Sequence, residues 1–326
     1  MSKVLITGGA GFIGSHLAEA LLCEGFSVLC LDDLSTGNIK NLDEVISDPR
    51  FEFVHGSVLD PVAVDEAVRD VDVVVHLAAA VGVKLIIEKP LKSLIVNIEG
   101  TRNVLEAAER WKKKLLITST SEVYGKNPNQ PFSETSDRIL GSVTVARWSY
   151  STAKAIDEIL ALTYFKEGRC DPVIVRLFNT VGPRQIGTYG MVIPRLVSQA
   201  LRGDDLTIYG DGNQTRCFCH VKDVVRALML LIEEPKAIGE IFNVGSTEEV
   251  SINQLANMIL DMTGSKSRIK YIPLHEAYEE GFEDMERRVP DTKKVKDYIN
   301  WEPECSLEMI LKDVIDDLRE QMKKMS

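Results

Sequence analysis

The chain contains no run of about 20 apolar residues, the length that a helix needs to span a membrane. Basic side chains are also scarce relative to acidic ones. The 326 residues include 38 lysines and arginines against 49 aspartates and glutamates, so the net charge is −11. This charge argues against broad binding to nucleic acids or anionic membranes, although a local basic pocket could still hold a small anion. We therefore expect neither a nucleic acid nor a membrane among the partners.

Cysteine occurs six times, and no two cysteines have the Cys-x-x-Cys spacing of a zinc or redox motif. One stretch, Cys217-Phe-Cys219-His220, looks like a metal motif, but no second pair of ligands accompanies it, and the edge of a strand explains it better. The sequence enters an apolar strand at Lys3, which leaves no room for a signal peptide. We expect no metal, reduced cysteines and a cytoplasmic protein.

Glycines gather where the first predicted strand meets the first predicted helix. The run 4–7 is rich in β-branched residues and predicts a buried strand, and the apolar residues from Phe12 onward have helical spacing. Between them, Gly8, Gly11 and Gly14 permit a tight turn in which the backbone comes close to a ligand. Free N–H groups at the start of the helix can then bind a pyrophosphate. The stretch therefore predicts a dinucleotide site, with Phe12 and Ile13 beside the phosphates.

The next predicted strand, 27–31, ends in Asp32-Asp33. A carboxylate at this position accepts hydrogen bonds from the 2′-hydroxyl of an adenosine ribose and repels a 2′-phosphate. The pair of aspartates therefore favours NAD over NADP.

Predicted strands and helices alternate through the first half of the chain, which is typical of a parallel sheet covered by helices on both faces. Further strands are predicted at 51–55, 72–79, 115–121 and 172–178, and helices at 60–69, 91–111 and 150–167. After residue 180 the alternation becomes irregular, although 241–245 predicts a strand that returns to the sheet. We expect an α/β fold with two domains: a Rossmann-type, doubly wound parallel sheet (1–180) and a smaller C-terminal α/β domain that binds the substrate (181–326).

A candidate catalytic group lies on the fifth predicted strand and the helix after it. Lys154 follows Tyr150 by four residues, so both lie on one face of the helix. A nearby ammonium and the positive nicotinamide of NAD would lower the pKa of a phenol from about 10 towards neutrality, which would make Tyr150 a general base. Thr120, at the carboxyl end of the strand, could hold the substrate hydroxyl that is oxidised.

Along its whole length the chain resembles the extended short-chain dehydrogenases/reductases that modify nucleotide sugars. The motifs that carry the resemblance fall in the family's order: TGGAGFIGSHL at 7–17, HLAA at 76–79, TSTSEVYG at 118–125, YSTAK at 150–154, RLFNTVGPR at 176–184 and RVPD at 288–291. The resemblance implies NAD as cofactor and a Thr120–Tyr150–Lys154 triad. Tyr150 takes the proton of a sugar hydroxyl, usually at C4, while a hydride passes to NAD.

The resemblance also implies binding roles for residues outside the triad. Around the cofactor they are Ser57, Val58, Leu77, Ala78, Ala79 and Asn97. Many relatives have aspartate where this chain has Ser57, which leaves the contact to adenine open. Asn179, Arg216 and Arg288 match positions that hold the nucleotide diphosphate, and the region from Val192 to Tyr209 would form the pocket for the base.

Two motifs point to different branches of the family. Glu122 resembles the acidic residue of sugar-nucleotide decarboxylases and 4,6-dehydratases, and Arg147-Trp148-Ser-Tyr150 is similar to decarboxylases that act on UDP-glucuronate. The usual dehydratase aspartate is Ser121 here. The segments at 79–83 and 97–101 resemble those of epimerases.

The primary prediction is a 4-epimerase that acts on a UDP-hexose or UDP-hexuronate, with Ser121 and Arg184 as anchors of a sugar carboxylate. The alternative is a UDP-glucuronate decarboxylase that uses Glu122. A 4,6-dehydratase or a non-catalytic NAD-binding protein is a further alternative. The resemblance also implies a homodimer formed through the helices 91–111 and 150–167.

Overall fold

A seven-stranded, wholly parallel sheet organises the molecule in the computed structural model, which describes residues 2–82, 88–187, 191–273, 276 and 285–325. Its strands are β1 (Lys3–Thr7), β2 (Ser27–Asp32), β3 (Phe51–His55), β4 (Val73–His76), β5 (Lys114–Thr120), β6 (Asp171–Leu177) and β11 (Ile241–Val244). They lie in the order β11-β6-β5-β4-β1-β2-β3, so the winding reverses beside β1. This doubly wound arrangement confirms the predicted fold class, and it opens a crevice at the carboxyl ends of β1 and β4.

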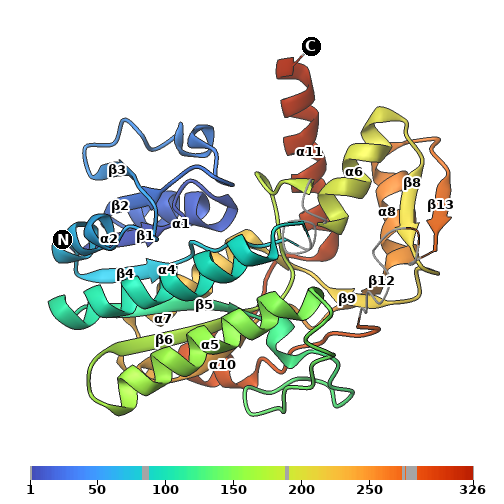
Figure 1. Ribbon diagram of the computed structural model, residues 1–326. Helices are drawn as coiled ribbons and strands as arrows, with labels where there is room; N and C mark the ends of the chain where they lie inside the picture. The colour runs from blue at the N-terminus through green and yellow to red at the C-terminus, as the bar shows by residue number, and fades with distance from the viewer. Residues whose placement is uncertain (1, 83–87, 188–190, 274–275, 277–284, 326) are drawn as a thin grey trace.

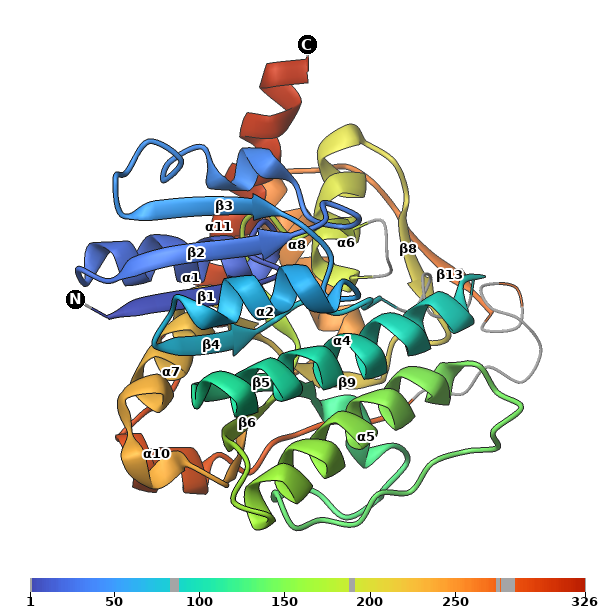
Figure 2. The ribbon, with the colours of Figure 1, turned by 60° about the vertical axis from the view of Figure 1, so that its left-hand side comes forward.

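Helices cover both faces of the sheet (Figures 1 and 2). On one face lie α1 (Phe12–Cys23), α7 (Val221–Glu233) and α10 (Lys293–Ile299). On the other lie α2 (Pro61–Arg69), α4 (Pro90–Trp111) and α5 (Arg147–Lys166). The interior strands are buried on both sides and consist largely of Val, Ile and Leu, as a sheet with two covered faces requires.

The C-terminal part forms a separate apolar core beside the sheet. It contains α6 (Val192–Arg202), α8 (Ile252–Thr263), α11 (Leu307–Met325), β8 (Leu206–Tyr209), β9 (Thr215–Cys217), β12 (Glu249–Ser251) and β13 (Ile269–Ile272). Between this part and the sheet, β7 (Thr180–Val181) pairs with β10 (Cys219–His220). The second half of the chain contributes to both parts, because α7, β11 and α10 pack on or pair with the large sheet.

Short 3₁₀ helices complete the described structure: η1 (Ile39–Leu42), η2 (Ser121–Tyr124) and η4 (Pro235–Ala237). None of the helices in the described part of the chain combines the length and apolar character that a membrane crossing requires.

Helix α5 begins at Arg147, one turn before the predicted start at Tyr150. The difference has a tertiary cause. Arg147 and Trp148 are buried, and the guanidinium of Arg147 is paired with Glu122, so contacts from outside the helix hold its first turn in place.

Candidate active site

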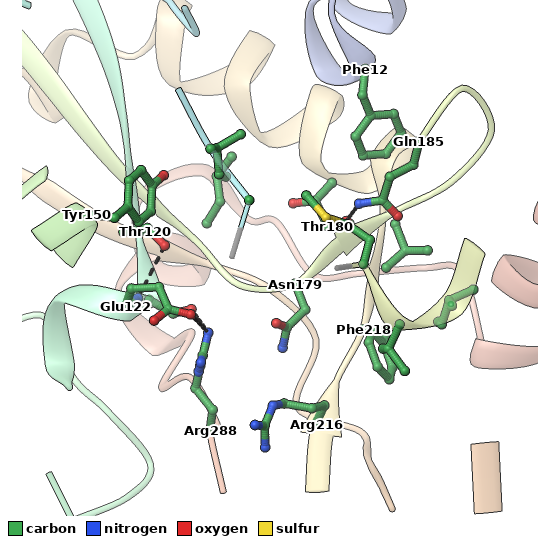
Figure 3. A pocket seen from close by; sticks show the side chains of 18 of the residues that line it. Phe12, Thr120, Glu122, Tyr150, Asn179, Thr180, Gln185, Arg216, Phe218 and Arg288 are labelled. Atoms are coloured by element: carbon green, nitrogen blue, oxygen red, sulfur yellow. Dashed lines mark hydrogen bonds and ion pairs between the residues drawn. The ribbon is translucent and has the colours of Figure 1, made fainter. Parts of the chain in front are cut away.

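A pocket of about 400 Å³ lies where the sheet meets the C-terminal part. The carboxyl ends of β5 and β6 contribute one wall and the start of α1 another. The C-terminal part closes the far side with residues of α6, β8 and β9 (Figure 3). Phe12, Ile13, Leu77 and Ala79, all predicted cofactor residues, line the pocket near the switch point of the sheet.

The glycine-rich turn has the shape that a dinucleotide requires. Gly8 has φ +73°, and a Cβ there would lie 2.8 Å from the backbone nitrogen of Ala78. A Cβ at Gly14 would overlap the carbonyl oxygen of Gly8. Helix α1 starts after Gly11 without a side-chain cap, so its first N–H groups point out of the helix with no capping partner. These features fit the pyrophosphate of a dinucleotide.

Asp32 and Asp33 differ in their surroundings. Asp32 is buried at the end of β2, where it accepts hydrogen bonds from the backbone nitrogens of Ala10 and Leu34, and burial raises its pKa. The Asp33 carboxylate is bonded to the backbone nitrogen of Ser35 and to the Ser57 hydroxyl, and these hydrogen bonds outweigh burial and lower its pKa. Asp32 therefore ties the glycine-rich turn to β2, and Asp33 and Ser57 form one polar group.

Other predicted cofactor residues support the pocket from behind. The side chain of Asn97 bonds both backbone groups of Ala80 and so fixes the segment after β4. Val58 is buried against Gly100. The backbone nitrogen of Ala78 donates to the Thr7 hydroxyl.

Thr120, Tyr150 and Lys154 are all buried. Thr120 and Tyr150 line the pocket, and Lys154 follows Tyr150 by one turn of α5. The charged groups of the chain do not lower the pKa of Tyr150 as expected. Burial raises the pKa of Tyr150, and the carboxylates of Glu122 and Asp157 add to this, while the Thr120 hydroxyl acts in the opposite direction. Burial is the largest of these causes. Lys154, the expected source of positive charge, is paired with Asp157 at 2.8 Å, so its charge is largely offset.

Glu122 is the centre of a charged cluster at the same end of the pocket. Its carboxylate lies 2.7 Å from Arg288 and 3.2 Å from Arg147 (Figure 3 shows the contact with Arg288). Burial alone would raise the pKa of Glu122, but Arg147, Arg288 and Arg216 lower it to about 2. Glu122 is therefore ionised throughout the neutral range. Because its pKa is depressed, the stability that it contributes is present above about pH 4.3 and is lost as the pH falls towards 2.

Ser121 lies beside this cluster. Its hydroxyl accepts a hydrogen bond of 3.3 Å from Arg288. The Nε atom of Arg288 is buried and has no hydrogen-bond partner among the described residues.

The pocket also contains the residues predicted to hold the nucleotide: Arg288 is paired with Glu122, and Arg216 helps to lower the pKa of Glu122. Asn179 and Arg216 line the pocket together with Val192 and Tyr209. The Asn179 amide donates to the carbonyl of Cys217, which places β9 against the end of β6.

Sequence reasoning missed several lining residues. Arg195 stacks its guanidinium 4.5 Å from the ring centroid of Tyr209, and Gln185, Gln214 and Phe218 also line the pocket. Arg147, which was named from the sequence only as part of a decarboxylase-like motif, precedes Tyr150 by one helical turn and also lines the pocket. Arg195 lies on α6, inside the region 192–209 predicted for the base, although it was not singled out. Gln185, Gln214 and Phe218 lie outside regular helices and strands, where no periodicity indicates the direction of a side chain.

Arg184 is not among the residues that line the pocket. It has φ +68°, and its guanidinium bonds Ser15 and Glu19 on α1. The structure therefore gives it a structural contact to α1 and does not support the predicted role as a carboxylate anchor.

No three His, Cys, Asp or Glu side chains of the described segments are grouped so that they could hold a metal ion. Cys217 and Cys219 are buried on the short strands β9 and β10, and both are free thiols.

The model of the GDP-mannose 4,6 dehydratase family matches residues 5–314. The chain belongs to this family. It is 45% identical over 320 residues, 98% of each chain, to the UDP-N-acetyl-alpha-D-glucosaminuronate decarboxylase of Bacillus cytotoxicus. It is 35% identical over 322 residues to UDP-glucuronic acid decarboxylase 1 of Arabidopsis thaliana, covering 98% of this chain and 70% of the relative.

Among solved structures, the UDP-glucuronic acid 4-epimerase of Bacillus cereus, in complex with UDP-glucuronic acid and NAD, matches with a TM-score of 0.88. The two are 31% identical, and the match covers 98% of this chain and 99% of the epimerase. The predicted membership of the nucleotide-sugar-modifying enzymes is confirmed.

Proposed function

We propose that the protein is an NAD-dependent decarboxylase that oxidises C4 of a UDP-linked hexuronic acid and releases C6 as carbon dioxide. This replaces the primary sequence prediction, a 4-epimerase, with its alternative. The observation that carries the proposal is the buried Glu122 carboxylate between Arg147 and Arg288, at the end of the pocket where Thr120 and Tyr150 lie. The decarboxylase relatives support it independently.

The charges of this cluster suit an acidic sugar. Two arginines and one glutamate leave a net positive charge, which a neutral hexose cannot use but a C6 carboxylate can. An arginine pair alone would stabilise the carboxylate and oppose its loss. Glu122 offsets half of that charge, so the site recognises the acid without holding its ionised form as tightly as two unpaired arginines would.

The triad would supply the proton transfer that accompanies oxidation at C4. Thr120 would hold the C4 oxygen while Tyr150 accepts its proton, and bound NAD would accept the hydride from C4 and later return it. The product of this step is a β-keto acid. Its C5–C6 bond breaks, carbon dioxide leaves, and the bonding electrons pass through C5 to the C4 oxygen to form an enolate. The enolate takes up a proton at C5. Return of the hydride to C4 and of the Tyr150 proton to the oxygen would give a UDP-pentose.

The glycine-rich turn, together with Asp32 and Asp33, supports NAD as this cofactor. The two carboxylates end β2 where a 2′-phosphate would meet like charge, so NADP should bind more weakly.

The second candidate is the epimerase, for which Ser121 provides a specific observation. Its hydroxyl is oriented by Arg288 and could hold a carboxylate out of line with the C4 carbonyl, which would prevent loss of carbon dioxide.

Product analysis separates the two candidates. The protein would be incubated with NAD and either UDP-glucuronate or its 2-acetamido analogue, with carbon dioxide measured and nucleotide sugars identified by NMR. We expect carbon dioxide and a UDP-pentose or its 4-keto form from at least one of them. A 4-epimer without carbon dioxide would favour the epimerase. The Tyr150→Phe variant is the control. It should fold and bind NAD but lose turnover by roughly 10²–10⁴-fold.

A further inference from the structure

Helix α5 buries an acid that the proposed chemistry does not use. Tyr150, Lys154 and Asp157 follow one another at spacings of four and three residues, so all three lie on one face of the helix. The Asp157 side chain is 0% exposed and that of Lys154 is 3% exposed. The Lys154 ammonium lies 2.8 Å from the Asp157 carboxylate.

Asp157 depends on Lys154 for compensation of its charge. Neither of its carboxylate oxygens makes a well-aligned hydrogen bond within the described residues. Burial raises the pKa of Asp157, and Lys154 and the nearby Thr101 hydroxyl of α4 act against this. An acid buried in this way would be costly without the ammonium, so the two charges hold each other in place.

The other charged groups around the pair are already engaged. Glu158, the next residue on α5, is paired with Arg176 and accepts a hydrogen bond from Ser119 on β5. His76 on β4 bonds Thr7 and Thr101, and burial, together with Lys154, lowers its pKa to about 3, so it is neutral.

On the other side of Tyr150, Glu122 is paired with Arg147 and Arg288, and Arg216 also acts on it. Within the part of the chain that the structure describes, Asp157 is therefore the carboxylate paired with the catalytic lysine.

We propose that Asp157 is a positioning residue that anchors the Lys154 ammonium and sets the pH range in which Tyr150 accepts a proton. With Asp157 in place, Tyr150 faces a nearly neutral ion pair in place of a full positive charge. The phenol then keeps its proton until another positive charge arrives, and the oxidised nicotinamide ring is such a charge. The ion pair would thus allow Tyr150 to act as a base only when oxidised NAD, the hydride acceptor, is bound.

This inference rests on the proposed role of Tyr150 as base, which a decarboxylase and an epimerase share. It does not depend on the fate of the 4-keto sugar. Turnover by the unmodified protein, and its loss in Tyr150→Phe, test the function. The pH profile of Asp157 variants tests the inference.

The test compares kcat/KM against pH for the unmodified protein, Asp157→Asn and Asp157→Glu. Removal of the carboxylate charge favours the tyrosinate, so in Asp157→Asn the acid limb of the profile should move to lower pH by about one unit. Asp157→Glu keeps the charge and should restore the original limb. Tyrosinate formation can also be followed without turnover, by ultraviolet absorbance with NAD bound and with Tyr150→Phe as the reference. The pH at which half of Tyr150 is ionised should be lower in Asp157→Asn than in the unmodified protein.

Asp223→Asn is the matched control. Asp223 on α7 is equally buried, and it accepts hydrogen bonds from the backbone nitrogens of Glu304 and Cys305, away from the pocket. Its variant should lose stability and leave the pH profile unchanged. If Asp157→Asn does not fold, Asp157→Ser, which leaves room for a water, takes its place. An acid limb that stays fixed or moves to higher pH in the neutral variants would overturn the proposal, as would an equal shift in Asp223→Asn.

Discussion

The proposed decarboxylation depends on the charge of a single side chain, Glu122. Its pKa of about 2 keeps it ionised, so it does not donate protons between pH 5 and 9 and acts through its charge alone. In Glu122→Gln the two arginines keep their full positive charge and should bind the substrate carboxylate more tightly. We expect KM to fall, C4 oxidation to persist, and carbon dioxide release to slow on the order of 10²-fold.

Transient absorbance of NADH would report the oxidation, and trapped carbon dioxide the second step. Tyr150→Phe should lose both signals and serves as the comparison. Equal losses of oxidation and carbon dioxide release in Glu122→Gln would remove Glu122 from the decarboxylation step.

Residue identities were the most predictable part of the site. The spacing of Tyr150 and Lys154 and the position of Thr120 follow from helix and strand geometry. In the structure Thr120 and Tyr150 line the pocket, and Lys154 is buried one turn further along α5. The charge around Tyr150 was not predictable, because Asp157 acts on Lys154 through burial that the sequence does not reveal. The predicted role of Arg184 as a carboxylate anchor has no support in the structure, because its guanidinium bonds Glu19 on α1 and the residue does not line the pocket.

At the scale of elements, the close packing of the glycine-rich turn on α1 leads to a second prediction. A methyl group at Gly14 would overlap the Gly8 carbonyl, so Gly14→Ala should force the turn away from the helix start. We expect NAD affinity to fall at least about tenfold, which corresponds to 1.4 kcal/mol, as measured by calorimetry and by the NAD content of the purified protein.

Gly264→Ala is the control for this prediction. Gly264 ends α8 with φ +68°, and a Cβ there would meet no atom within 4 Å. The control should lose about 1 kcal/mol of stability and bind NAD normally. If Gly14→Ala bound NAD as well as the control, the turn would not be the pyrophosphate site.

The strands of the large sheet were predictable to within a few residues because most of them are buried apolar runs, although β3 at the edge is largely exposed. The small pairs β7–β10, β9–β12 and β8–β13 were not. They have two to four residues each, and partners supplied by distant parts of the chain, rather than their own propensity, make them strands.

At the scale of the whole molecule, α4 and α5 lie side by side on the outside of the sheet (Figure 2). Apolar side chains on them face solvent, with Leu91 69% and Ile159 58% exposed. We predict a homodimer through this face, which sedimentation at micromolar concentration would detect. Ile159→Asp should yield monomers. Val62→Asp on α2, where the valine is 65% exposed, should leave the assembly unchanged. A monomeric unmodified protein would contradict the prediction.

The return of β11 to the sheet has a consequence for synthesis on the ribosome. Strand β6 is complete at residue 177, but its neighbour β11 ends only at residue 244, after α6 and α7 have been made. Until then the backbone of β6 presents an open edge of Val and Ile residues to the cell. A nascent chain that stalls between these two points would carry an unpaired strand, the kind of surface that chaperones bind and that seeds aggregation. Truncation just after the first six strands should therefore give an aggregating fragment and no free nucleotide-binding unit.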